Sequence, residues 1–183
     1  MSALVAASAS SEAAQAAART PQAAPKPSAS ATPTPATTGA AARQQSGKRG
    51  QTLLLARPVG GPIAVTVVKV VNPDTATKQA ESPPDGEHLE SIEFHIKNAG
   101  TTPYQENPFI DINASDDDAT IVEFAQVTAT HAGPQLPMSL NLAPGASVTG
   151  FATFDVLEGD NISSVVYALD GGLYSSSGSW QLD

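Results

Sequence analysis

The stretch from Leu142 to Val156, LAPGASVTGFATFDV, constrains the fold more than any other part of the sequence. After the Pro-Gly turn, apolar residues that include Val148 and Phe154 alternate with mostly polar residues that include Thr149. Successive side chains of a β-strand point to opposite faces, so this period of two predicts a strand with one buried face. Phe151 falls on the otherwise polar face of this strand.

Comparable patterns recur through the second part of the chain, with turn signals every ten or so residues. Ile63–Val71 is rich in β-branched residues, and Ile92, Phe94 and Ile96 share one face of a further predicted strand. We expect about seven to eight short strands and no helix longer than two turns. This pattern is typical of an antiparallel β-sandwich of immunoglobulin-like type, although a closed barrel fits the same pattern.

Residues 1–50 differ in composition from the rest of the chain. They are mostly Ala, Ser, Thr, Pro, Gln and Gly and contain no aromatic residue. Such a segment cannot bury enough apolar surface to offset the entropy lost on ordering, so we predict a disordered spacer. Residues 51–183 carry every Phe, Tyr and Trp and have the length of one domain, so we predict that they form the β-sandwich.

The first residues predict a route out of the cytoplasm. Residues 1–9, MSALVAASA, resemble the last part of a secretory signal, with small residues at a cleavage-type position. The apolar core is too short for a complete signal, and no positive charge precedes it. We therefore predict an exported or envelope-associated protein whose signal is incomplete here. The alternative is an Ala-rich cytosolic N-terminus.

Charge and cysteine content exclude several classes of function. Residues 51–183 contain 17 Asp and Glu against four Lys and Arg. This charge repels phosphate backbones and anionic lipid headgroups, so we expect no nucleic-acid partner, and we expect no transmembrane segment. The chain has no cysteine, which excludes disulfides, thiol catalysis and thiolate metal sites.

Two segments carry a resemblance to a known family. FHIKNAG, residues 94–100, and the stretch 142–156 match its pattern of a strand ending in Asn-x-Gly and a later Pro-Gly turn before a Gly- and Phe-containing strand. Over roughly residues 60–170 the chain resembles an uncharacterised family of exported actinobacterial immunoglobulin-like domains. That family is related to the mycobacterial immunoprotective extracellular protein. The resemblance implies an extracellular, lipoprotein-like setting and brings no catalytic residues, but this chain lacks a lipidation cysteine.

The run from Phe109 to Phe124, FIDINASDDDATIVEF, is the strongest candidate for chemistry. It contains four clustered carboxylates, Asp111, Asp116, Asp117 and Asp118. A helix–loop–helix calcium site needs Gly at its sixth place and Glu at its twelfth, where this chain has Asp116 and Val122. We predict instead a β-hairpin tip, where Asp and Ser bond to backbone. If the domain binds a metal, we expect weak Ca²⁺ binding at these carboxylates, and we expect no other cofactor.

No motif in the sequence indicates catalysis. Serines lack the Gly-x-Ser-x-Gly setting, and no glycine-rich phosphate loop precedes a helix. A hydrolase whose site is assembled from distant residues remains an alternative. We predict that the protein is not an enzyme.

Aromatic residues offer candidate contact points. Phe151 lies on the predicted outward face of its strand, where an exposed ring would indicate an interface unless a neighbouring loop covers it. Trp180 is the second candidate, and its alternative role is to fill the core or an edge of the sandwich. We therefore predict an exported β-sandwich that acts through contacts with a protein or with the cell envelope. The alternative is a module that binds Ca²⁺ or a glycan.

Overall fold

The computed structural model describes residues 43–173 and 176–183, and within them nearly every element is a β-strand. Predictions for residues 1–42, including the signal remnant at 1–9, lie outside the described residues. The elements in chain order are β1 (Gln44–Lys48), β2 (Thr52–Leu55), β3 (Ile63–Asp74), the 3₁₀-helix η1 (Gln79–Glu81), β4 (Glu87–Asn98), β5 (Tyr104–Glu106), α1 (Pro108–Asp111), β6 (Ile112–Asp116), β7 (Ile121–Phe124), β8 (Ala129–Thr130), β9 (Gly133–Pro134), β10 (Leu140–Leu142), β11 (Ser147–Leu157), β12 (Ile162–Ala168), the 3₁₀-helix η2 (Leu169–Gly172) and β13 (Ser177–Gln181).

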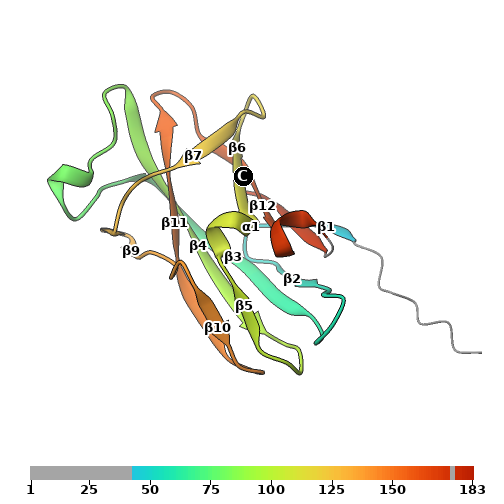
Figure 1. Ribbon diagram of the computed structural model, residues 1–183. Helices are drawn as coiled ribbons and strands as arrows, with labels where there is room; N and C mark the ends of the chain where they lie inside the picture. The colour runs from blue at the N-terminus through green and yellow to red at the C-terminus, as the bar shows by residue number, and fades with distance from the viewer. Residues whose placement is uncertain (1–42, 174–175) are drawn as a thin grey trace, which may run out of the picture. The chain divides into compact units, whose positions relative to one another are not determined.

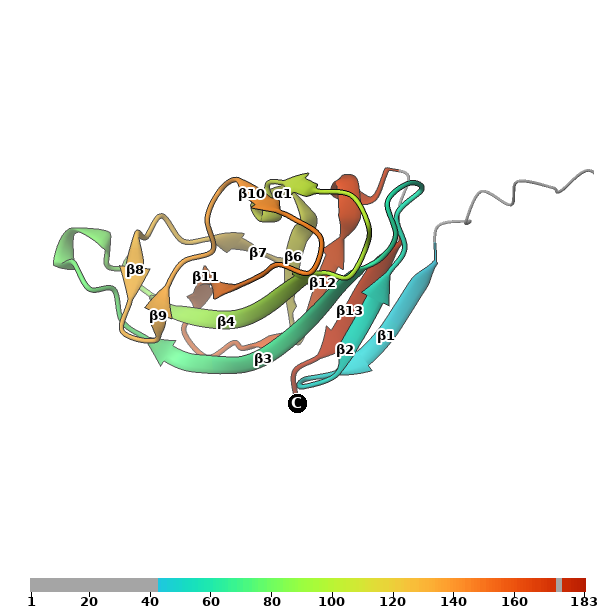
Figure 2. The ribbon, with the colours of Figure 1, turned by 90° about the horizontal axis from the view of Figure 1, so that it is seen from below.

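One nine-stranded sheet folds over itself to make both layers of a β-sandwich. Its strand order is β1-β13-β12-β6-β7-β11-β4-β3-β2, and every neighbouring pair is antiparallel except β1 with β13. Strands β1, β13, β12 and β6 form one layer, strands β11, β4, β3 and β2 form the other, and β7 pairs with both β6 and β11 (Figures 1 and 2). The predicted β-sandwich is therefore confirmed. Two short two-stranded sheets, β5 with β10 and β8 with β9, account for most of the strands beyond the predicted number.

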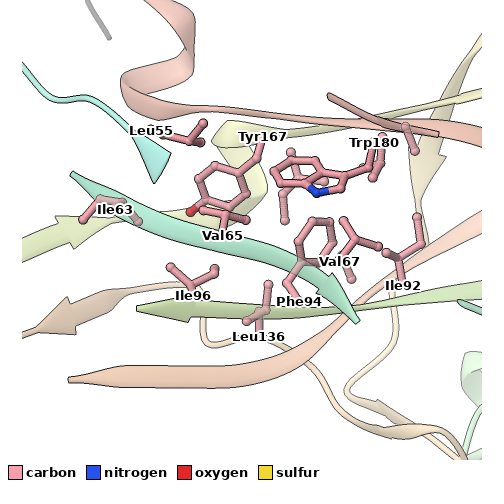
Figure 3. Packing of buried hydrophobic residues seen from close by; sticks show 14 of the residues in the cluster. Leu55, Ile63, Val65, Val67, Ile92, Phe94, Ile96, Leu136, Tyr167 and Trp180 are labelled. Atoms are coloured by element: carbon pink, nitrogen blue, oxygen red, sulfur yellow. The ribbon is translucent and has the colours of Figure 1, made fainter. Parts of the chain in front are cut away.

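The core lies between the two layers and is apolar throughout its centre. Tyr167 and Trp180, from β12 and β13, lie against Val65, Val67 and Phe94 from β3 and β4 (Figure 3). All five side chains are fully buried. Burial of large aromatic side chains supplies most of the stabilising free energy of a domain that has no disulfide.

The sandwich begins earlier in the sequence than predicted. Strand β1 lies inside the range 1–50 that composition assigned to the spacer, and it pairs in parallel with β13 from Gln44 to Lys48. The predicted boundary between residues 50 and 51 is therefore wrong. The segment QQSGK has no apolar alternation because β1 is an edge strand with only partly buried side chains.

Strand β11 has the alternation that the sequence predicts. Phe154 and Val156 are buried in the core, and Thr149 points to the opposite face of the sheet. On the edge away from β4, β11 accepts hydrogen bonds from two separate segments. Ala125 N donates to Thr153 O at 2.9 Å, and Leu136 N donates to Phe151 O at 2.8 Å. From Ala125 the chain leaves the edge of β11, and it returns to that edge at Leu136. We call residues 125–138 the excursion.

No helix within residues 43–173 and 176–183 has the length and apolar character needed to cross a membrane.

Candidate functional site

The acidic run forms the tip of the β6–β7 hairpin. Strands β6 and β7 pair antiparallel through Ala114 with Val122 and Ser115 with Ile121. Asp116 closes the turn, because its Oδ1 accepts hydrogen bonds from Asp118 N at 3.0 Å and Thr120 N at 2.8 Å. These are the local side-chain-to-backbone bonds that favour Asp in turns. The predicted hairpin tip is confirmed.

Asp111 does not belong to this hairpin tip. It ends helix α1, it is fully buried, and its carboxylate bonds to Tyr104 and Gly171 instead. The grouping of Asp111 with Asp116, Asp117 and Asp118 is therefore corrected: spacing suggested one loop, but α1 turns Asp111 into the interior. Among the residues that the structure describes, no group of three or more His, Asp or Glu is arranged to hold a metal ion.

Asp116 is expected to stabilise the turn through the hydrogen bonds that its side chain accepts from backbone N–H groups, and not through a bound metal ion. Replacing Asp116 by alanine leaves Asp118 N and Thr120 N without their shared acceptor, which should lower the unfolding free energy by about 1 kcal/mol. Thermal unfolding with and without millimolar Ca²⁺ checks this. The loss should be the same in both buffers, and Asp117→Ala should be nearly neutral. A Ca²⁺-dependent rise in Tm that disappears in Asp116→Ala would instead establish the weak calcium site.

Phe151 is buried, so its assignment as an interaction residue is wrong. The side chain is 2% exposed although it lies on the outward face of β11. Strand β9 covers it, since a Cβ built on Gly133 would come within 2.7 Å of the Phe151 ring. Lys69 Nζ lies 5.1 Å from the centroid of the same ring. From the sequence, a covering loop was the alternative to an exposed ring at Phe151, and that loop is the excursion 125–138.

Trp180 is buried as well, which corrects its assignment as a contact residue. The indole is 0% exposed and packs in the core between the layers (Figure 3). Its Nε1 donates a hydrogen bond to Gln51 O at 2.9 Å, so the polar edge of the ring also has a partner. Trp180 therefore fills the core, which was the alternative to a contact role.

A buried polar network lies where α1, β5, β12 and η2 meet. Asp111 Oδ2 accepts a hydrogen bond from Tyr104 Oη at 3.2 Å, and Asp111 Oδ1 accepts one from Gly171 N at 2.9 Å. The hydroxyls of Tyr104 and Tyr167 lie 3.1 Å apart. Burial raises the pKa of Asp111 to about 6 and the pKa of both tyrosines above the usual range.

Two further carboxyl groups adjoin this network. The side chains of Glu106 and Asp170 are joined by a hydrogen bond. Burial, this bond and the charges of Asp111 and Asp170 raise the pKa of Glu106 to about 7. Asp170 is held in the left-handed region at φ 55°. We call Glu106, Asp111 and Asp170 the acid cluster; Glu106 and Asp170 line a hollow that Arg57 also lines.

A groove at the edge of the sandwich, within the described part of the chain, has a volume of about 550 Å³. Its walls come from α1, from the end of β7 and from the excursion 125–138. The apolar side chains that line it are Phe109, Phe124, Val127, Leu136 and Met138. We call this cavity the edge groove. Figure 1 shows α1 and the chain that leads from β7 to β9, which contribute these walls.

Aromatic rings join the edge groove to the core. The rings of Phe109 and Phe124 meet edge to face with centroids 5.2 Å apart, and Phe124 stacks on the buried Phe154 at 4.7 Å. Met138, which also lines the groove, is 73% exposed. The lining therefore combines packed aromatic rings with a flexible, accessible thioether, which is a side chain that adapts to varied apolar partners.

The polar groups of the edge groove are mostly engaged already. Gln135 Nε2 donates to Thr153 Oγ1 at 2.7 Å, and both the backbone N and the hydroxyl of Thr128 bond to Glu81. Gln126 is the polar side chain of this lining that has no partner within residues 43–173 and 176–183. No charged residue of the described chain lines the groove.

Neither the edge groove nor the acid cluster was predicted from sequence. One signal was present: Phe109 and Phe124 bracket the acidic run, and a hairpin at its centre necessarily brings its two ends near each other. The acid cluster had no such signal, because Glu106 and Asp170 are far apart in sequence and meet only through the tertiary fold.

Comparison with known proteins supports the fold. The sequence matches no family model, and the search of curated proteins gave no match. Among solved structures, the chain is similar to MPT63, a secreted protein from Mycobacterium tuberculosis, with 18% identity, coverage of 76% of this chain and 98% of that one, and a TM-score of 0.53. It is also similar to the yjhA protein from Bacillus subtilis, with 19% identity, coverage of 74% and 98%, and a TM-score of 0.52.

These similarities span almost the whole length of both neighbours, but at such identities they establish the fold alone. They support the β-sandwich part of the resemblance drawn from sequence. Membership of an actinobacterial family stays a prediction.

Proposed function

We propose that the protein is an exported or envelope-associated β-sandwich domain that is not an enzyme and that binds an extended, uncharged polypeptide segment in the edge groove. The observation that carries the proposal is a groove of about 550 Å³, lined without charge in a strongly acidic domain. Ligand sites are typically concave, mostly apolar and of this size. The secreted neighbour MPT63 supports the exported location.

The chemistry of the lining favours an apolar peptide over the other ligand classes. A glycan needs many hydrogen bonds, but the side chains of Thr128 and Gln135 are already bonded within the protein. Calcium needs several oxygen ligands of its own, and no carboxylate lines the groove. Apolar side chains of a peptide could instead pack on Phe124 and Met138, and Gln126 could bond to its backbone.

The burial of Asp111 argues against a catalytic role for this member of the acid cluster. Asp111 is fully buried and both of its oxygens accept hydrogen bonds from protein groups. A general acid or base must come within hydrogen-bonding distance of the proton that it transfers, which a carboxylate enclosed in this way cannot do.

A charge placed in the lining of the groove at Met138 should weaken binding about tenfold. The change is Met138→Glu, and the matched control is Leu157→Glu on the exposed end of β11, where the side chain is 60% exposed and outside the groove. The probes are N-phenyl-1-naphthylamine, an uncharged apolar dye, and capped peptides selected on the full chain from a random display library. Fluorescence titration should show about tenfold weaker binding for Met138→Glu, because a carboxylate must be desolvated there.

The control should bind as the unaltered protein does, and Tm should differ little among the three proteins because both sites are exposed. Selected peptides should be rich in apolar and poor in charged residues. If both variants bind the probes equally well, the edge groove is not the binding site. Enrichment of glycans or acyl chains over peptides in parallel titrations would replace the polypeptide with that ligand class.

A further inference from the structure

Helix α1 belongs to both the edge groove and the acid cluster. Phe109 lines the groove and packs on Phe124, whereas Asp111, two residues later, is buried in the acid cluster. A helix of four residues has no stability of its own, so contacts at its ends fix its position. At its start, Asn107 Oδ1 accepts a hydrogen bond from Phe109 N at 3.1 Å. At its end, the bonds of Asp111 attach it to β5 and η2.

The groups around the acid cluster carry an excess of negative charge when they are ionised. The titratable and charged groups that face it are Glu106 and Tyr104 from β5, Asp111 from α1, Tyr167 from β12, Asp170 from η2 and Arg57 from the segment after β2. Strand β10, which pairs with β5, contributes Leu140, Asn141 and Leu142, none of which titrates.

Arg57 compensates this charge only in part. Its guanidinium donates to the carbonyl oxygens of Gly60, Gly61, Thr102 and Pro103, and it lies 5.5 Å from the centre of the Tyr104 ring. This one cation, which is largely occupied by backbone, lines the hollow together with Glu106 and Asp170 of the three carboxyl groups. These groups repel one another unless protons are bound.

Protonation of the carboxyl groups therefore affects how firmly η2 is held beside β5, in addition to the bond from Gly171 N to Asp111. A hydrogen bond between the side chains of Glu106 and Asp170 requires a proton on one of them. When both are ionised, the bond is replaced by repulsion that acts on Asp170. The next residue is Gly171, whose N–H anchors Asp111. Displacement of η2 would thus loosen the end of α1 and, through it, the Phe109 wall of the groove.

We propose that the acid cluster gates the edge groove: with protons bound it fixes α1 and keeps the groove formed, and on deprotonation it releases α1 and weakens binding. The inference rests on the proposed function for its ligand. Its structural part is the coupling of the acid cluster to α1, and that part does not depend on a ligand.

Hydrogen exchange of the full chain without ligand tests the structural part. Protection factors, corrected for the intrinsic effect of pH, should fall about tenfold for residues 106–112 between about pH 5 and about pH 8, while those of β3 and β4 stay constant. In the variant Glu106→Gln/Asp170→Asn the amides keep the hydrogen bond and cannot ionise, so protection should change with pH far less than in the unaltered protein, with Asp111 as the one remaining carboxyl group of the cluster. The matched control is Asp118→Asn/Glu158→Gln, which removes two exposed carboxylates outside the acid cluster. Equal protection at both pH values in the unaltered protein would overturn the proposal.

Titration with N-phenyl-1-naphthylamine, which keeps its charge over this range, tests the functional part. The unaltered protein and the control should bind about tenfold more weakly at about pH 8 than at about pH 5, and the affinity of the Glu106→Gln/Asp170→Asn variant should depend on pH far less. Binding that is independent of pH in all three proteins overturns the gate but leaves the proposed function intact. Absence of binding at both pH values counts against the proposed function, and hydrogen exchange then still decides the coupling.

Discussion

Replacing Trp180 by alanine should destabilise the domain by about 4 kcal/mol, enough to lower Tm by more than about 10 °C. The side chain is 0% exposed and fills the centre of the core between β13 and the facing strands (Figure 3). Alanine removes its apolar contacts, leaves a cavity and leaves Gln51 O without the indole donor. Chemical denaturation followed by far-ultraviolet circular dichroism measures the change.

Trp180→Phe is the variant with which Trp180→Ala should be compared. It keeps most of the ring volume and loses the hydrogen bond, so we expect a loss of about 2 kcal/mol. Probe binding to the folded fraction should be unchanged in both variants. A Trp180→Ala protein of normal stability that lost probe binding would restore Trp180 to the role of contact residue that was predicted for it from the sequence.

The sequence allowed the fold to be predicted where burial follows strand periodicity. Along β11 the alternation correctly separated Phe154 in the core from Thr149 on the other face. The same reasoning failed for Phe151, because periodicity identifies which face a residue is on and not what covers that face. The cover is β9, whose Gly133 approaches the ring closely because it has no side chain.

Failures at the candidate site have the same origin. Asp111 was grouped with Asp116 by spacing alone, but an Asn-Pro pair at residues 107 and 108 starts a short helix that turns Asp111 inward. The partners of Asp111 come from β5 and from η2, which is sixty residues further along the chain. Local sequence contains no information on a contact of that range. Functional prediction from sequence therefore identified the hairpin tip but missed the acid cluster behind it.

The stability of the domain should fall as pH rises from about 5 to about 8. Folding raises the pKa of Glu106 to about 7 from its ordinary value of 4.5 and that of Asp111 to about 6 from its ordinary value of 3.8. A group whose pKa is raised in the folded state binds its proton more tightly there, so its stabilisation is complete below the unfolded pKa. That stabilisation is lost as pH rises through the folded pKa. The window is therefore about pH 4 to about pH 8, with the folded state favoured at the acidic end.

We expect a total loss on the order of 3 kcal/mol, or about 10 °C in Tm, measured by thermal unfolding across this window at constant ionic strength. Burial also raises the pKa of Glu90 and of Asp155, so part of the slope arises elsewhere in the domain. The variant Glu106→Gln/Asp111→Asn isolates the contribution of the acid cluster, because its amides keep the shapes and cannot titrate. Its Tm should depend on pH far less than that of the unaltered protein. If the two proteins have the same slope, or if stability rises with pH, then the acid cluster is ionised at no cost to folding, and repulsion within it cannot be the force that releases α1.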